Sequence, residues 1–308
     1  MPWRIGYSAQ SDMPPDAEAQ RPMLRGVADL TLERRAGRTR LTSARTRPPL
    51  LVQHALYPDD GAPDMAYVFL ANPTGGFLEH DRHEICISVG AGARAHVTTQ
   101  SATKVHTMTH GVAEQRVALN VAGGGYLEYL PDPLIPFRNA SLVQRADITV
   151  EPGAALVYGD TITPGRVARG EAFQYCRLSN RLAVHRREAR PVYREAFDIA
   201  PDADGLPGIR TFDPICQSVA EYTATPTLGS LLILCDSMKA GGILDQAREQ
   251  LARSCSVSAG ASLLPDGGGV GVKMIGEDCS AVQAAVHEVW SIARRALLGT
   301  APQSLRKY

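Results

Sequence analysis

The fold is decided by the segment Ile87–Val97, with the sequence ISVGAGARAHV, because the chain repeats its pattern twice further on. The later copies are Leu119–Tyr129, LNVAGGGYLEY, and Ile148–Tyr158, ITVEPGAALVY. Each copy has an apolar run, a glycine turn and a second apolar run, which is typical of two strands joined tightly. The turn glycines that the copies share are Gly92, Gly124 and Gly153. Their spacing of 32 and 29 residues predicts a coil of repeated units that stack their apolar faces on one another.

Further strands are expected on both sides of these copies, from Leu24 to about Phe197, with no convincing amphipathic helix between them. Turns containing Gly, Pro or Asp separate the runs, which are residues 28–33, 39–43, 50–55, 67–70, 84–89, 94–99, 115–121, 126–130, 146–150, 155–158, 173–178 and 182–186. The sequence therefore predicts a mainly β protein, an elongated and β-solenoid-like stack of β-hairpins.

The pattern changes in the last quarter of the chain. A buried strand is predicted over 227–235 and a helix over Met238–Arg253. A hairpin over 257–275 follows, and then an amphipathic helix over Ser280–Leu298, with Ser280 as its N-cap. These elements predict a small α+β part that carries two helices.

Four segments follow from this division, and they are expected to form a single domain overall. Residues 1–22 are expected to be a disordered leader, and 23–200 the β-coil body. Residues 201–226 are rich in Asp, Gly, Pro and Thr, which predicts a loop. Residues 227–308 form the α+β part, which we expect to pack on the same body because no long linker isolates it.

Composition excludes several classes of function for this chain of 308 residues. Its 32 lysines and arginines balance 32 aspartates and glutamates, so no net field attracts nucleic acid or anionic lipid. No run approaches the roughly 20 apolar residues of a membrane span, and the N-terminus lacks the apolar core of a signal peptide. We therefore expect a cytoplasmic protein. The six cysteines form no C-x-x-C pair and are expected to be reduced and mostly in the core.

Stacked copies place equivalent side chains next to one another, which predicts which polar groups meet. The alignment puts together His96, Glu128 and Val157. Four residues further on, it puts together Gln100, Asp132 and Thr161. We expect a polar ridge across the coils, formed by Thr98, Thr99, Gln100, Glu128, Asp132 and Asp160. The alternative is a solvated sheet edge, where charged groups deter aggregation.

A second group of ionisable side chains lies at Glu79–Glu84, with the sequence EHDRHE. Its imidazoles and carboxylates are ligands that nickel or zinc accepts. Glu79, Asp81 and His83 share one face of a strand, whereas His80 and His83 point to opposite faces. A preformed site with three ligands would need a curled turn. Weak, local capture of a metal ion by Glu79, His80 and His83 therefore competes with an interpretation as solvated turn charges.

Motifs of enzymes find little support in the sequence. The glycine runs at 123–125 and 267–271 fit neither a P-loop nor a dinucleotide fingerprint, and hairpin turns explain them better. Glu128 and Asp132 could serve as the acid and base of a carbohydrate-active β-coil enzyme. Such a coil usually displays aromatic platforms, and the chain has only six Phe and two Trp, with ten Tyr, to supply them.

Six motifs resemble the urease accessory protein family UreD, also called UreH. They are Asn72–Gly76 (NPTGG), Thr98–Lys104 (TTQSATK), Leu127–Phe137 (LEYLPDPLIPF), Tyr158–Asp160 (YGD), Pro164–Glu171 (PGRVARGE) and Arg306–Tyr308 (RKY). Together they span the chain from about residue 24 to its end. The third and fifth motifs are quite specific, and the order of all six is hard to obtain by chance.

The resemblance implies a metallochaperone that is not an enzyme. Proteins of this family bind apo-urease, recruit a UreF-type scaffold and through it a UreG-type GTPase, and help to deliver nickel to the urease active site through an internal passage. The family fold is an elongated coil of β-strands with a small helical part, in agreement with the repeats. No tightly bound cofactor is expected, and Ni²⁺ would be held only transiently. The alternative is a purely structural scaffold of the urease activation complex that never contacts nickel.

The resemblance also assigns roles to individual residues. A nickel passage needs weak oxygen ligands at intervals, which would be Asp81, Thr98, Thr99, Glu128 and Asp132. Arg166 and Glu171 are expected to bind a partner or to support the structure. One departure concerns Asp81, because the family pattern has the form Gly-Gly-x-x-x-Gly-Asp and here Glu79 and His80 precede the aspartate. Either the turn is rebuilt with a different backbone, or this chain has gained a point of metal capture.

Overall fold

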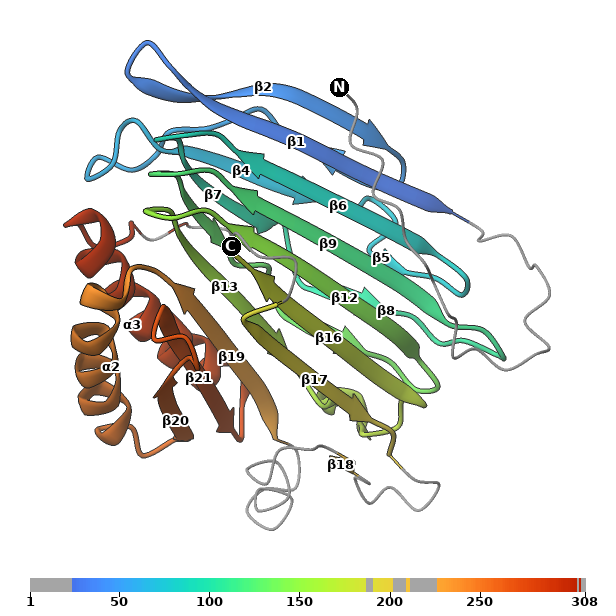
Figure 1. Ribbon diagram of the computed structural model, residues 1–308. Helices are drawn as coiled ribbons and strands as arrows, with labels where there is room; N and C mark the ends of the chain where they lie inside the picture. Colours follow the sequence, from blue (N-terminus) through green and yellow to red (C-terminus); the bar gives the residue numbers. More distant parts are fainter. Residues whose placement is uncertain (1–23, 187–190, 202–208, 211–225, 304, 306–308) are drawn as a thin grey trace.

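A computed structural model describes residues 24–186, 191–201, 209–210, 226–303 and 305. Two β-sheets lie face to face, and two helices cover the outer face of the second sheet (Figure 1). The chain winds from one sheet to the other, so that strands from successive coils lie side by side. The expected mainly β fold, a β-solenoid-like coil with a small part that carries two helices, is confirmed.

Sheet A contains the longer strands of the coil. In spatial order its strands are β18 (Ile209–Arg210), β17 (Tyr193–Ile199), β16 (Arg177–His185), β12 (Ser141–Val150), β9 (Ala113–Val121), β6 (Arg82–Val89), β1 (Arg25–Arg35) and β2 (Arg38–Arg47). The strands from β16 to β1 run parallel, because each belongs to a new turn of the coil. The antiparallel strands β17 and β2 flank this parallel set.

Sheet B faces sheet A and continues into the C-terminal part. Its order is β20 (Val257–Leu263), β21 (Gly269–Gly276), β19 (Thr227–Leu234), β13 (Ala155–Ile162), β10 (Tyr126–Tyr129), β7 (Arg94–Thr99), β4 (Ala66–Ala71) and β3 (Leu51–Val52). A third, shorter side of the coil is formed by β5 (Gly76–Phe77), β8 (Thr103–Val105) and β11 (Leu134–Pro136), which pair in that order. Each coil therefore has two long sides and one short side.

The register between coils is the one that the repeats predict. Ile87 of β6 pairs with Leu119 of β9, which in turn pairs with Ile148 of β12. The three turn glycines Gly92, Gly124 and Gly153 have φ of 64°, 71° and 74°. This left-handed conformation costs glycine little. One turn geometry, used three times, therefore sets the register of both sheets.

Two apolar cores fill the space between the layers. Successive residues of a strand point to opposite faces, so Leu127 and Tyr129 of β10 pack between the two sheets. Tyr126 of β10 and Val157 of β13 pack instead on the side of the helices. A third apolar cluster, which includes Phe77 and Val105, lies at the short side of the coil. The layers are thus sheet A, sheet B and helices.

The C-terminal part extends sheet B instead of forming a sheet of its own. β19 pairs antiparallel with β13, and β21 with β19. Helices α2 (Ser237–Ala252) and α3 (Cys279–Leu298) pack against this extension and against each other. The N-cap of α3 is Asp278, whose carboxylate accepts the Ala281 N–H at 2.8 Å, so the predicted cap Ser280 is wrong. A carboxylate two positions earlier already satisfies that backbone donor.

Two more expectations are corrected by the structure. One strand, β16, replaces the two predicted over 173–178 and 182–186, because its nine residues pair with β12 without a break. The cysteines are not mostly in the core, since of the five that the structure describes Cys235 is the buried one and two are exposed. All five are free in the structure, and their reduced state stays a prediction.

Some expectations concern residues outside the described part of the chain. They are the leader at 1–22, most of the loop at 201–226 and the motif at 306–308. Two residues of that loop form β18, which pairs with β17. The division into four segments stays a prediction. Among the described residues, neither helix is both long enough and apolar enough to cross a membrane.

Candidate functional site

The expected polar ridge is divided between the two faces of sheet B. Glu128 faces α3, because Trp290 and Arg294 of that helix contact its carboxylate. Asp160 faces sheet A and lines a cavity with Asn180 of β16. The helix-side network consists of Asp59, Tyr67, His96, Tyr126, Glu128, Trp290 and Arg294. The inter-sheet cluster consists of Tyr158, Asp160, Asn180, Tyr193, Glu195 and Lys273.

Glu128 is the centre of the helix-side network and is completely buried. Its Oε1 accepts hydrogen bonds from the Tyr126 hydroxyl and from Trp290 Nε1, each at 2.7 Å. Its Oε2 lies 2.7 Å from His96 Nδ1 and 3.4 Å from Arg294 Nη1. Burial opposes the charge, but the hydrogen bond and charge of His96 and the charge of Arg294 outweigh it, so the pKa of Glu128 is below its usual value.

Arg294 links Glu128 to a second buried carboxylate. Its guanidinium donates to the Tyr67 hydroxyl at 2.8 Å and pairs with Asp59. Tyr67 donates in turn to Asp59 at 2.7 Å. Two carboxylates therefore share one guanidinium between α3 and sheet B. Because removal of one partner from such a buried set leaves charges unpaired, the network clamps α3 in place.

Stacked coils bring Thr99 to Asp132, both members of the expected ridge, although the repeat alignment put Gln100 next to Asp132. Thr99 Oγ1 donates to Asp132 Oδ2 at 3.0 Å and accepts the Asp132 backbone N–H at 2.8 Å. Thr98 Oγ1 donates to the Leu130 carbonyl at 2.6 Å. Asp132 is partly exposed, unlike Glu128. The pair of Thr99 and Asp132 thus presents oxygen atoms that water can still reach.

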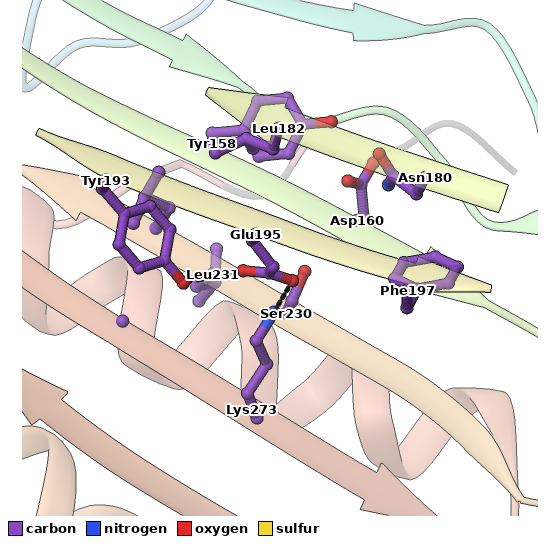
Figure 2. Close-up of a pocket in the computed structure, with 12 residues that line it drawn as sticks. Tyr158, Asp160, Asn180, Leu182, Tyr193, Glu195, Phe197, Ser230, Leu231 and Lys273 are labelled. Carbon is purple, nitrogen blue, oxygen red and sulfur yellow. Dashed lines mark hydrogen bonds and ion pairs between the residues drawn. The ribbon is translucent and has the colours of Figure 1, made fainter. Parts of the chain in front are cut away.

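The inter-sheet cluster surrounds a small cavity between sheets A and B (Figure 2). Its volume of about 20 Å³ is room for about one water molecule. Figure 2 shows Asp160 and Asn180 facing one another on one side of the cavity, and Glu195 joined to Lys273 on the other. Five strands supply the lining: β13, β19 and β21 of sheet B, and β16 and β17 of sheet A.

Asp160 has the most informative electrostatics in this cluster. Burial, with a smaller contribution from the negative charge of Glu195, raises its pKa to about 6, although a hydrogen bond from Tyr158 and the charge of Lys273 act in the opposite direction. Asn180 donates a further hydrogen bond to Asp160, while its own Oδ1 is buried without a partner. The cluster therefore holds oxygen atoms that could accept a proton, a water molecule or a cation.

Many residues of the helix-side network and of the inter-sheet cluster were not predicted from the sequence. Asn180, Glu195 and Lys273 lie on strands that the three-copy alignment does not include, so that alignment could not bring them to Asp160. A weak signal existed for the helix-side network. Arg294 follows Trp290 by four residues on the apolar face of the last helix, where an arginine needs a buried partner. The partner itself could not be read from the sequence.

Glu79 is bound by the backbone of a neighbouring loop. Its carboxylate accepts the N–H groups of Thr109 at 3.2 Å, His110 at 2.8 Å and Gly111. His80 has φ of 67°, the left-handed conformation that a glycine would adopt at little cost. His80 therefore adopts a left-handed turn here, and the hydrogen bonds of Glu79 tie this turn to the neighbouring loop.

The group at Glu79–Glu84 does not form a preformed metal centre. His83 is buried against the Phe77 ring, with centroids 4.2 Å apart, and burial lowers its pKa to about 4. Within the described residues, no three His, Cys, Asp or Glu side chains form a group that could hold a metal ion. Capture of a metal ion by Glu79, His80 and His83 stays a prediction. Such an ion would have to compete with the backbone N–H groups that already bind the Glu79 carboxylate.

Asp81 immediately precedes β6 and is completely buried. Its Oδ2 accepts the Leu78 N–H at 2.9 Å, which fixes the preceding turn, whereas Oδ1 has no partner. Burial raises the pKa of Asp81, and the backbone hydrogen bonds reduce this effect. Nearby His106 also has a buried ring nitrogen without a partner. Asp81 is therefore a carboxylate whose Oδ1 can still accept a hydrogen bond, and it lies outside the expected polar ridge.

Arg166 and Glu171 close a small hairpin of their own. The hairpin consists of β14 (Gly165–Arg166), the short 3-10 helix η1 (Val167–Arg169) and β15 (Glu171–Ala172). Arg166 contacts the Glu171 carboxylate at 2.7 and 2.6 Å, and its guanidinium lies 3.8 Å from the centre of the Phe137 ring. These contacts account for a structural role. Binding of a partner at this hairpin stays a prediction.

Comparisons with known proteins agree on one family. The family model described as UreD urease accessory protein matches residues 24–307. A urease accessory protein UreD of Haloarcula marismortui is 34% identical over 304 residues, which cover 98% of this chain and 96% of that protein. A UreD 2 of Streptomyces griseus is 33% identical, over 92% of this chain and 93% of that protein. A UreD 2 of Brucella suis is 30% identical, over 88% and 87%. With its fold and nearly its whole length matched, the chain belongs to the UreD family of urease accessory proteins.

Proposed function

We propose that this protein helps to deliver nickel to apo-urease in the cytoplasm, in a complex with a UreF-type scaffold and, through it, a UreG-type GTPase. Its role in urease maturation follows from its family. The nickel step is carried by one observation, the cavity in which Asp160, Asn180 and Glu195 present oxygen atoms between the sheets. Nickel is the cargo in this proposal, and the chain performs no catalytic step.

The chemistry of the oxygen groups supports a passage with weak stops. Nickel binds imidazole and thiolate more strongly than carboxylate or hydroxyl oxygens. An ion held by one or two carboxylates can therefore leave again, which a passage requires. The pair of Thr99 and Asp132 and the pair of Asp160 and Asn180 would provide two such stops on neighbouring coils.

Two substitutions test the passage by removing charge without removing volume. Asp132→Asn and Asp160→Asn would each be co-expressed with urease and its other accessory proteins. We expect the nickel content of purified urease, measured by elemental analysis, to fall severalfold in both. Asp245→Asn, on the exposed side of α2, is the matched control and should leave the nickel content unchanged.

Assembly must be measured in the same cells, because a variant that fails to join the complex would also lower the nickel content. A pull-down on tagged urease should recover both variants at the wild-type level. Full nickel content of urease with both variants would contradict the passage. Recovery of the complex with nickel-poor urease is the expected result.

A purely structural scaffold is the second candidate, and the helix-side network favours it. The two oxygens of Glu128 are already surrounded by Tyr126, His96, Trp290 and Arg294, which leaves a metal ion to compete with four groups of the protein itself. The scaffold predicts the reverse pattern. Arg166→Glu would abolish assembly in the pull-down, while Asp132→Asn and Asp160→Asn would leave urease fully loaded.

A further inference from the structure

We propose that Lys273 is an internal counter-ion that occupies the inter-sheet cluster until an entering metal cation displaces its ammonium group. The inference rests on the proposed function, because it concerns how the same cluster is regulated. It assigns to this lysine a task that differs from simple cross-linking of two sheets. The cation and the ammonium would alternate at Glu195, so that the carboxylates are never left without a positive charge.

The position of Lys273 fits this task. It extends from β21 of sheet B and pairs with Glu195 Oε1 of β17 in sheet A (Figure 2). The other oxygen of Glu195 accepts the Tyr193 hydroxyl at 2.9 Å. The side chains of Lys273 and Glu195 are 31% and 26% exposed. The pair therefore lies where the cavity meets solvent, and Asp160 lines the same cavity.

The charges of the cluster require a counter-ion. Asp160 and Glu195 can each carry one negative charge and Lys273 one positive charge, which leaves one net negative charge when all three are ionised. The negative charge of Glu195 and the positive charge of Lys273 both act on Asp160. Without Lys273 the two carboxylates would repel each other across a small space. A divalent cation could replace the ammonium and would also meet the unpaired Asn180 Oδ1.

A plain structural ion pair would leave the adjacent cavity and the unpaired Asn180 Oδ1 without explanation. A partly exposed pair contributes little to stability, and it needs neither an adjacent cavity nor an unused acceptor. Lysine can leave an ion pair more easily than arginine, because its ammonium is a point charge on a flexible stem. Arg294 shows the contrast, since its guanidinium is completely buried and held by Asp59 and Tyr67. Lys273 can move its charge into solvent, whereas Arg294 cannot.

Binding of Ni²⁺ to the isolated full-length protein tests the inference without urease. The titration would be followed by calorimetry at neutral pH for the wild type and for Lys273→Met, which keeps the length of the side chain and removes its charge. We expect the variant to bind Ni²⁺ about tenfold more tightly or better, because the ion no longer competes with a cation a few ångströms away. An unchanged affinity would overturn the inference.

Three further variants separate the local effect from others. Lys239→Met removes the same charge from an exposed position on α2 and should leave the affinity at the wild-type value; an equal gain there would overturn the inference. Lys273→Arg keeps the charge and should show no gain. Adding Glu195→Gln to Lys273→Met should cancel the gain, and a gain that persists would contradict displacement at Glu195. Thermal melts check that each variant is folded.

The outcome also distinguishes this inference from the proposed function. Full loading of urease by Asp132→Asn and Asp160→Asn would contradict the passage, whatever Lys273→Met does to the affinity. An unchanged affinity of Lys273→Met would remove the counter-ion while leaving the passage intact. The two measurements use different samples and different readouts, so neither failure can be mistaken for the other.

Discussion

The helix-side network and the inter-sheet cluster use the same kinds of residues in opposite ways. Both contain carboxylates, tyrosines and basic side chains, and both lie against sheet B. Around Glu128 four groups of the protein surround the two oxygens, and the carboxylate has no contact with solvent. Around Asp160 there is a small cavity and an unpaired amide oxygen.

This difference teaches how to separate a stabilising carboxylate from one that can handle an ion. A buried carboxylate surrounded by donors is expensive to disturb and gains nothing from a metal ion. A carboxylate beside free space and an unused acceptor is held in a less favourable charged state, as the raised pKa of Asp160 indicates. The direction of the pKa shift therefore differs between Glu128 and Asp160, and so do the expected effects of substitution.

The largest effect is expected for Glu128→Ala. The substitution leaves Arg294 with one carboxylate fewer and removes the acceptor of Trp290 and Tyr126. Breaking a buried set of charges in this way costs about 3–5 kcal/mol, so the free energy of unfolding measured in urea should fall by that amount. Glu249→Ala is the matched control, because its ion pair with Arg253 on α2 is exposed and should not shift the midpoint.

The loss in Glu128→Ala should also depend on pH. The pKa of Glu128 is lowered in the folded protein, so its contribution is present above the unfolded pKa near 4.5 and disappears as the pH falls through the lower folded value. The difference between wild type and variant should therefore shrink in acid. A variant as stable as the wild type at pH 7 would contradict the clamp role of the network.

A smaller effect is expected for Trp290→Phe. The substitution keeps an aromatic ring against His96, whose ring centre lies 5.4 Å away, but removes the indole donor to Glu128 Oε1. Loss of one hydrogen bond to a buried charge costs about 2 kcal/mol. The free energy of unfolding should fall by less than in Glu128→Ala. Combining both substitutions should cost less than the sum, because the donor and the acceptor belong to one interaction.

The smallest effect, and one of opposite sign, is expected for Asp160→Asn. The pKa of Asp160 is raised from 3.8 to about 6, so the folded state binds its proton more tightly than the unfolded state. The aspartate therefore destabilises the fold above about pH 6, and this cost disappears as the pH falls toward 4. Asp160→Asn should be more stable than the wild type by about 1 kcal/mol at pH 7, less than the full shift implies because the site is partly hydrated.

Urea unfolding at pH 7 and at pH 4 measures this sign directly. We expect the wild type and Asp160→Asn to differ at pH 7 and to coincide at pH 4. Destabilisation by Asp160→Asn at neutral pH would mean that the cluster is a stabilising network like that of Glu128. The comparison between the two regions would then no longer hold.

The repeats allowed much of the fold to be predicted, but they placed the ridge incorrectly. Glu128 aligns with Val157, and Asp160 lies three positions beyond Val157. An odd number of steps along a strand changes the face of the sheet, so Glu128 and Asp160 could not belong to one ridge. His96 and Glu128 were aligned with each other and are found in contact, whereas Asp132 was aligned with Gln100 and is bonded to Thr99 instead. The turn at His80 could be recognised as a departure, but its left-handed φ could not be predicted from the sequence.

By itself, the sequence determined the coil, its register and the meeting of His96 with Glu128 on neighbouring strands. Those features depend on local turn geometry and on a repeat that fixes equivalent positions. Only the tertiary structure decided what covers each face of sheet B. On one face, α3 places Arg294 against Glu128. On the other face, β17 places Glu195, paired with Lys273 of β21, across the cavity from Asp160. These partners come from segments outside the repeat, and no periodic pattern specifies a contact with such a segment.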